Sequence, residues 1–180
     1  MFIIVKACDN LDCGVRGDAP GRMREGVMDK SLGDGASDAV DTMAISGLPG
    51  QYEQRTKDVI VRVEPEYLAE QSSPTDGRFI WAYTVEIDNQ SAHDLRVTGR
   101  YWHIADSRGQ VQEVRGQGVV GETPVVKAGE QFRYTSGAPL SAPSGMMSGS
   151  YRVEPETGEP YDIDIPVFLL DSPFEGTLFN

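Results

Sequence analysis

The chain is short of the residues that covalent cross-links and many catalytic sites require. Its 180 residues include only two cysteines and two histidines. Both cysteines, Cys8 and Cys13, lie near the start, so the remainder cannot depend on a disulfide. They have no nearby histidine or second cysteine pair to complete a zinc site. Such sparse thiol content is typical of a reducing compartment.

Long hydrophobic runs are also missing. The apolar start of the chain is interrupted by Lys6 after five residues, whereas the core of a signal peptide needs about 7 to 15. No later run approaches the roughly 20 apolar residues of a membrane-spanning helix. We therefore expect a cytoplasmic protein.

Basic residues are outnumbered, with 16 Lys and Arg against 28 Asp and Glu and a formal net charge of −12. The lysines and arginines are scattered singly rather than clustered. An acidic chain of this kind repels nucleic-acid phosphate and anionic lipid. The composition therefore argues against nucleic-acid binding and against binding to a membrane surface.

The chain divides into two parts of different composition. Residues 1–51 are rich in glycine and small polar residues and show no sustained amphipathic pattern, so we expect a largely disordered extension. Met28 and Met43 are alternative translation starts, which leaves open whether the whole extension is made. Residues 52–180 are numerous enough to bury a core of their own and are expected to form one domain.

The second part has the period-two alternation of β-strands. The clearest example places Phe79, Trp81 and Tyr83 on one face and polar or small residues on the other. Short segments of this kind are separated by turn residues, without a convincing intervening helix. The pattern predicts an all-β fold, an antiparallel β-sandwich of about seven strands resembling fibronectin type III and immunoglobulin domains. The expected strands cover 58–64, 79–87, 94–105, 110–114, 131–135, 149–154 and 160–169.

A glycine run, Gly116-Gln117-Gly118-Val119-Val120-Gly121, matches the spacing of a dinucleotide-binding loop. The residues that follow include β-branched residues and Pro124 where that motif requires a helix, so we reject a Rossmann site. Two interpretations remain. Gly116, Gly118 and Gly121 could present backbone N–H groups to an anion, with Arg115 supplying charge. The favoured interpretation is structural, since glycine permits positive φ and close strand approach.

Several motifs together resemble the ApaG family. They are Arg100-Tyr101-Trp102-His103-Ile104-Ala105-Asp106, the glycine run, Gly129-Glu130 with the segment after it, the glycine-rich segment 145–151, and Ile165-Pro166-Val167-Phe168. Ala128 and Ala142 depart from the family pattern. The resemblance covers residues 52–180 and implies a bacterial β-sandwich protein related in shape to fibronectin type III modules. Family labels imply a connection with cobalt and magnesium homeostasis, and similar domains in larger eukaryotic proteins, including an F-box protein, imply an adaptor role.

The residues themselves give little support to catalysis or to metal binding. A nucleophilic mechanism needs an activating partner, and no such constellation is visible, so we assign no catalytic residue, no metal ligand and no cofactor. His103 and Asp106 are the nearest candidate ligands, but their spacing places them on opposite faces of an extended strand. The acidic segment 154–164 is interpreted as the solvated face of a hairpin.

We therefore expect a non-enzymatic recognition module that binds another protein. The expected interaction surface includes Arg100, Trp102 and His103, close to the glycine loop. Pairing of two copies through exposed strand edges stays open. The alternative is a protein that binds a small ligand or an ion through the loop 116–121, with pyrophosphate, a dinucleoside polyphosphate, Co²⁺ or Mg²⁺ as candidates. A hydrolase acting on such nucleotides is the weakest of the three hypotheses.

Overall fold

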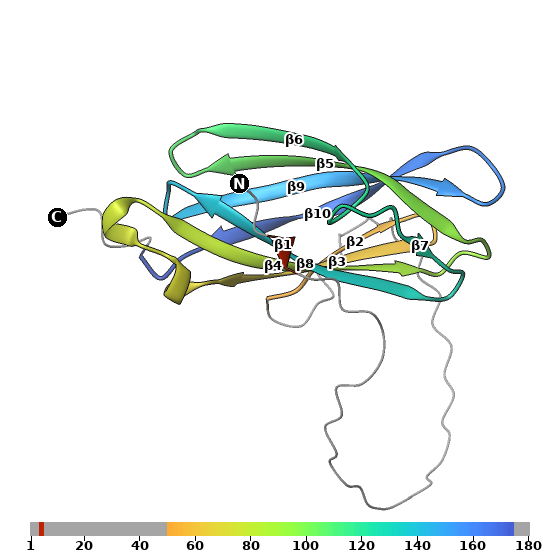
Figure 1. The fold of residues 1–180 in the computed structure, drawn as a ribbon, viewed down its shortest axis with the longest axis horizontal. Helices are drawn as coiled ribbons and strands as arrows, with labels where there is room; N and C mark the ends of the chain where they lie inside the picture. Colours follow the sequence, from red (N-terminus) through yellow and green to blue (C-terminus); the bar gives the residue numbers. More distant parts are fainter. Residues whose placement is uncertain (1–3, 6–49, 175–180) are drawn as a thin grey trace, which may run out of the picture. The chain divides into compact units, whose positions relative to one another are not determined.

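The computed structural model describes residues 4–5 and 50–174, which form two facing antiparallel β-sheets (Figure 1). One sheet has the strand order β1-β8-β4-β3-β2, and the other has the order β10-β9-β5-β6, with β7 also paired to β5. The strands are β1 (Ile4–Val5), β2 (Tyr52–Thr56), β3 (Val59–Tyr67), β4 (Phe79–Asn89), β5 (Leu95–Asp106), β6 (Val111–Gln117), β7 (Val125–Val126), β8 (Gln131–Leu140), β9 (Ser144–Pro155) and β10 (Tyr161–Asp171).

The expected antiparallel β-sandwich is confirmed. All seven expected strands are present, as β3, β4, β5, β6, β8, β9 and β10, and β1, β2 and β7 are additional short strands. Two 3₁₀ turns, Ala69–Gln71 and Pro74–Asp76, connect β3 to β4. Most of the predicted disordered extension lies outside the described residues.

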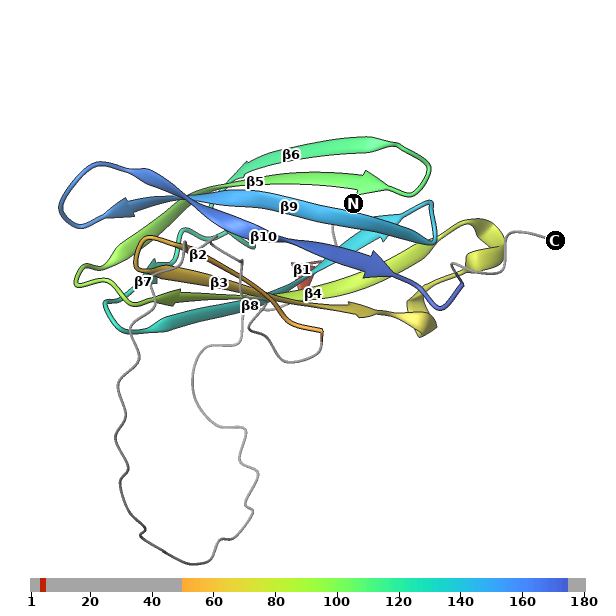
Figure 2. The ribbon, with the colours of Figure 1, turned by 180° about the vertical axis from the view of Figure 1, so that it is seen from behind.

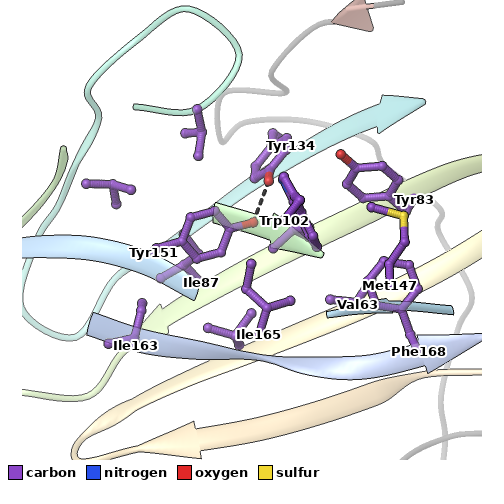
Figure 3. Packing of buried hydrophobic residues seen from close by; sticks show 14 of the residues in the cluster. Val63, Tyr83, Ile87, Trp102, Tyr134, Met147, Tyr151, Ile163, Ile165 and Phe168 are labelled. Carbon is purple, nitrogen blue, oxygen red and sulfur yellow. Dashed lines mark hydrogen bonds between the residues drawn. The ribbon is translucent and has the colours of Figure 1, made fainter. Parts of the chain in front are cut away.

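The core forms where the alternating strands of the two sheets face each other. Val63 of β3 and Tyr83 and Ile87 of β4 are buried from one sheet, and Tyr151 and Phe168 are buried from the other (Figure 3). Aromatic rings fill the centre, with the Tyr83 and Phe168 centroids 5.9 Å apart. Rings of this size supply much of the apolar area that stabilises a small core.

A β-bulge in β5 changes which residues face the core. The pairing of β5 with β9 shifts between Val97 and Gly99, so one residue is added to β5 at this point. Leu95 and Val97 are buried before the bulge, whereas Trp102 and Ile104 are buried after it. An extra residue reverses the alternation of side chains along a strand. The bulge therefore places Arg100, two residues before Trp102, on the inner side of the sheet.

The two sheets meet along β2 and β10, which lie at the same side of the sandwich (Figure 2). There the backbone N–H of Asp164 donates a hydrogen bond of 3.0 Å to Thr56 Oγ1, and the Tyr52 ring lies against Phe168. Elsewhere a cavity lies between β5 and β6 of one sheet and β4 and β8 of the other. Its lining includes the polar side chains of Tyr83, Arg100, Tyr134 and Ser136.

Candidate functional site

The glycine run forms the end of β6 and the tight loop after it. The backbone N–H of Val119 donates to the carbonyl of Glu122 at 2.8 Å, and the N–H of Glu122 donates back to Val119 at 2.9 Å. Gly118 has φ +54°, and a Cβ atom at this position would lie 1.8 Å from the Glu122 carbonyl oxygen. Gly118 is therefore required by the packing of the loop on itself.

The predicted use of this loop as an anion-binding nest depends on free backbone N–H groups. The N–H groups of Val119 and Glu122 each donate to the carbonyl of the other residue. The N–H of Gly118 donates to the Thr98 carbonyl at 2.9 Å. Gly121 also has positive φ, but it faces open space. In this conformation three donors of the loop serve the fold rather than a ligand.

Arg115, the predicted cation of that nest, lies on the outer face of its sheet. Its side chain is 75% exposed, with the guanidinium 4.6 Å from the Tyr101 ring centroid and 3.8 Å from the Glu113 carboxylate. Gly116 faces the other side, where a Cβ atom would lie 2.9 Å from Cζ of Arg100. The structure thus brings Arg100, rather than Arg115, against the inner side of the glycine run.

Arg100 fixes the start of the loop and lines the cavity. Its Nη1 donates to the carbonyls of Gln117 and Gly118, at 2.9 and 3.0 Å. The cavity has a volume of about 100 Å³. Its lining residues are Tyr83, Arg100, Trp102, Val114, Val120, Gly121, Tyr134 and Ser136.

Three buried tyrosines surround this cavity or support it from behind. The hydroxyls of Tyr134 and Tyr151 are hydrogen-bonded at 2.5 Å (Figure 3). Burial raises the pKa of both phenols, and the guanidinium of Arg100 opposes part of that rise. Burial also raises the pKa of Tyr83, partly offset by its hydrogen bond with Ser136 and by Arg100. All three phenols are therefore neutral hydroxyls at neutral pH.

The sequence singled out Arg100, but as part of an exposed interaction surface rather than as the cation of this cavity. Val97 and Trp102 are both buried although they are five residues apart, an odd spacing that would place them on opposite faces of a regular strand. This spacing of two apolar residues was the sign of a bulge in the sequence. Tyr83, Tyr134 and Ser136 were not identified as site residues. Pairing of β4 with β8 places Tyr83 opposite Ser136, and all three side chains line the same cavity.

The three residues of the predicted interaction surface are separated by the fold. Trp102 is 3% exposed, so its ring belongs to the core and cannot form part of a contact surface. His103 lies on the opposite, outer face, in register with Glu113 of β6 and Ser148 of β9. This is the orientation expected of His103 if Trp102 and Ile104 face the core. Arg100 points inward with Trp102.

The outer face of the four-stranded sheet carries an apolar row. In register across the sheet, Leu169 of β10 lies opposite Met146 of β9, Met146 lies opposite Ala105 of β5, and Ala105 lies opposite Val111 of β6. Leu169, Met146 and Val111 are 43%, 46% and 59% exposed. Met146 and Met147 face opposite sides of the sheet, as neighbouring residues of a strand do, and Met147 is buried in the core.

A shallow groove lies further along the same outer face. It has a volume of about 500 Å³, and its lining includes Tyr101, Arg115, Ser150, Arg152 and Asp162. Ser150 lies opposite Tyr101, and Tyr101 lies opposite Arg115. The outer face therefore carries an apolar end and a polar, arginine-containing end, with His103 between them.

Among residues 4–5 and 50–174, no group of three or more histidine, cysteine, aspartate or glutamate side chains is arranged to hold a metal ion. Within the same residues, no helix is long and apolar enough to cross a membrane. The acidic segment of β10 has the expected form, with Asp162 and Asp164 exposed and Ile163 and Ile165 buried.

The two facing sheets define this fold as a small antiparallel β-sandwich domain. The model of the ApaG domain matches residues 69–155. The chain is 50% identical over 129 residues to protein ApaG of Methylocella silvestris, an alignment that covers 72% of this chain and 99% of that relative. It is 52% identical over 122 residues to protein ApaG of Rhizobium leguminosarum bv. trifolii, covering 68% and 94%.

Solved structures agree with the sequence comparisons. A crystal structure described as an ApaA protein from Bordetella pertussis is 46% identical, with a TM-score of 0.62, over 64% of this chain and 94% of that one. A second structure, a structural-genomics target, is 37% identical with a TM-score of 0.62, over 68% and 93%. The chain belongs to the ApaG family, as the sequence motifs indicated.

Proposed function

We propose that this protein is a non-catalytic recognition module that binds an extended segment of another protein along β6 and the outer face of the four-stranded sheet. The observation that carries this proposal is the apolar row formed by Val111, Ala105, Met146 and Leu169. Three of these four side chains are large and well exposed. Contiguous apolar surface of this kind is typical of protein contact sites.

The free edge of β6 supports strand addition as the mode of binding. Within the described part of the chain β6 pairs with β5 on one side, and its outer edge has no paired strand (Figure 1). An added strand would satisfy the unpaired backbone groups of this edge and continue the apolar row beyond Val111. The partner should therefore carry an apolar residue beside Val111.

Charges along β6 define the partner further. Glu113 and Arg115 lie on the same outer face as Val111, two and four residues along the strand. Opposite charges directly across a strand pair are favourable, and like charges are unfavourable. A partner segment should thus place a basic residue opposite Glu113 and an acidic residue opposite Arg115, which also disfavours unspecific pairing at this edge.

The alternative, binding of a phosphate compound or a divalent cation by the loop 116–121, receives less support. The N–H groups of Gly118 and Val119 in this loop already donate within the protein, as does that of the adjacent Glu122. Arg115 is directed to the outer face, where it contacts Tyr101. Recognition of a polypeptide accounts for more of the exposed features than this alternative does.

The test uses a photo-reactive amino acid at Val111 in the full-length chain, produced in cells, with the same group at Gln131 of β8 as control. Gln131 is also exposed but lies on the other sheet. We expect a specific cross-link to one protein from Val111 and none from Gln131. Binding of that purified protein should weaken at least about tenfold with Met146→Lys and hardly change with Gln131→Lys, a difference of about 1.4 kcal/mol.

Equal cross-linking at both positions, or equal binding of the two lysine variants, would overturn the proposal. A cross-link from Val111 solely to a second copy of this chain would also overturn it, because the edge would then serve self-association. Circular dichroism of Met146→Lys checks that the fold is retained, as expected for a side chain that is 46% exposed.

A further inference from the structure

We infer that the cavity under the glycine loop is a binding site for a small carboxylate group, with the guanidinium of Arg100 as its ionic partner. This inference is independent of the proposed protein contact, because the cavity lies between the sheets and the apolar row lies on an outer face. The same chemistry could come from a free short-chain carboxylate or from an aspartate or glutamate side chain of a bound polypeptide.

Arg100 is an inward-facing cation without an acidic partner in the described residues. The β5 bulge directs it into the sandwich, and no aspartate or glutamate lines the cavity. Among the described residues, its hydrogen bonds to protein acceptors come from Nη1, which donates to the carbonyls of Gln117 and Gly118. The Nε and Nη2 donors therefore remain for a ligand, and a carboxylate accepts two parallel hydrogen bonds from a guanidinium edge.

The hydroxyl groups around the cavity have more donor protons than their mutual hydrogen bonds require. Tyr134 and Tyr151 share one hydrogen bond between two hydroxyls, and the hydroxyl-bearing side chains of Tyr83 and Ser136 line the same cavity. Each hydroxyl carries one proton, so the Tyr134–Tyr151 pair has one proton more than this bond uses. Burial keeps the three phenols protonated. The cavity is thus rich in donors and lacks an acidic acceptor.

Charge and size select a carboxylate over larger anions. One guanidinium balances one negative charge, whereas phosphate or pyrophosphate would bring additional buried charge without a partner. The volume of about 100 Å³ corresponds to several water molecules, since one needs about 10 to 15 Å³. Trp102, Val114 and Val120 form apolar walls suited to a short hydrocarbon stem.

The backbone beside the cavity is strained in the way that binding sites often are. Val120, which lines the cavity, has φ +52°. A β-branched residue at positive φ is a clear outlier. Such strain costs on the order of 1 to 3 kcal/mol and concentrates at ligand-binding positions. Val120 therefore contributes a strained, apolar wall to the cavity.

The test is an NMR titration of the full-length protein with sodium propionate at constant ionic strength, following the Arg100 Nε–H and Trp102 indole resonances. A terminally blocked peptide with one glutamate tests the side-chain source, and inorganic phosphate tests the competing anion. We expect saturable shifts with propionate, with the peptide, or with both. Affinity should fall at least tenfold in Arg100→Gln and stay unchanged in Arg115→Gln, whose guanidinium lies on the outer face.

Tyr83→Phe provides a second variant, because it removes one hydroxyl and retains the buried ring. We expect it to weaken propionate binding about threefold to tenfold, in line with the loss of one hydrogen bond. If Arg100→Gln does not fold, the propionate affinity of Tyr83→Phe, compared with that of the wild type, tests the inference instead. Absence of saturable shifts in the wild-type protein, tighter binding of phosphate than of propionate, or equal binding by Tyr83→Phe and wild type would overturn the inference.

Discussion

Gly118 illustrates how closely a single residue can be specified by its neighbours. We predict that Gly118→Ala destabilises the protein by about 2 kcal/mol or more, because positive φ costs an alanine roughly 1 to 2 kcal/mol and its Cβ would lie 1.8 Å from the Glu122 carbonyl oxygen. Gly121→Ala is the matched control, with φ +84° but open space around it.

Urea unfolding of both variants measures this difference. Gly121→Ala should lose only the backbone term of roughly 1 to 2 kcal/mol, and therefore less than Gly118→Ala. Equal losses in the two variants would contradict the role assigned to the Glu122 contact, because the backbone penalty alone would then account for both.

At the same scale, the sequence predicts some side-chain orientations and misses others. His103 faces outward and Ile104 inward, as alternation requires. Arg100 was expected at an exposed surface, since a charged residue is ordinarily solvated. Its inward direction depends on the bulge after Val97, and the pairing of β5 with β9 is what reveals that bulge.

Among the elements, β7 depends on a buried asparagine at the end of β4. Asn89 is fully buried, and its side-chain amide donates to the carbonyls of His93 and Val126, both at 2.9 Å. Its Oδ1 accepts hydrogen bonds from the backbone N–H and hydroxyl of Ser91. This one side chain holds the β4–β5 turn and β7 in place.

We predict that Asn89→Ala destabilises the protein by about 2 to 4 kcal/mol, because several buried groups lose their partners. Gln90→Ala, at the adjacent exposed position, should cost less than about 1 kcal/mol, because Arg55 is exposed and Asp88 keeps its ion pair with Arg62. Hydrogen exchange of the Val97 N–H, which donates to the Pro124 carbonyl beside β7, should accelerate in Asn89→Ala. Unchanged exchange would contradict the anchoring role.

The strand elements were predictable to different degrees. Long alternating segments such as β4 were found almost to their ends. β8 continues beyond its expected end through Gly137 and Pro139, and β9 begins earlier, at Ser144, because pairing with neighbouring strands overrides the low strand propensity of these residues. Two-residue β7 has no periodicity to detect, and its place is set by pairing with β5.

For the whole molecule, the buried tyrosines predict an alkaline limit to stability. Folding raises the pKa of Tyr134 and Tyr151 from 10.0 through burial. Above about pH 10 the unfolded chain therefore binds fewer protons than the folded one, and the free energy of unfolding decreases as pH rises. Below that pH both states are protonated and the contribution is fully present.

We expect each of these two tyrosines to lower the free energy of unfolding by up to about 1.4 kcal/mol per pH unit above pH 10. Urea unfolding at a series of alkaline pH values, together with tyrosinate absorbance, measures this effect. The variant Tyr134→Phe/Tyr151→Phe should show a shallower decline. Complete ionisation of all seven tyrosines near pH 10 in the folded protein would contradict the prediction.

The pairing order of the two sheets also governs how the chain acquires its structure during synthesis. β4 pairs with β8 along nearly its whole length, and β5 pairs with β9 in the same way. Both partners come tens of residues later in the chain, and contacts of such high sequence separation make folding slow. On the ribosome, the apolar faces of β4 and β5 therefore stay exposed until β8 and β9 have been synthesised. Chaperones can bind the nascent chain during this period.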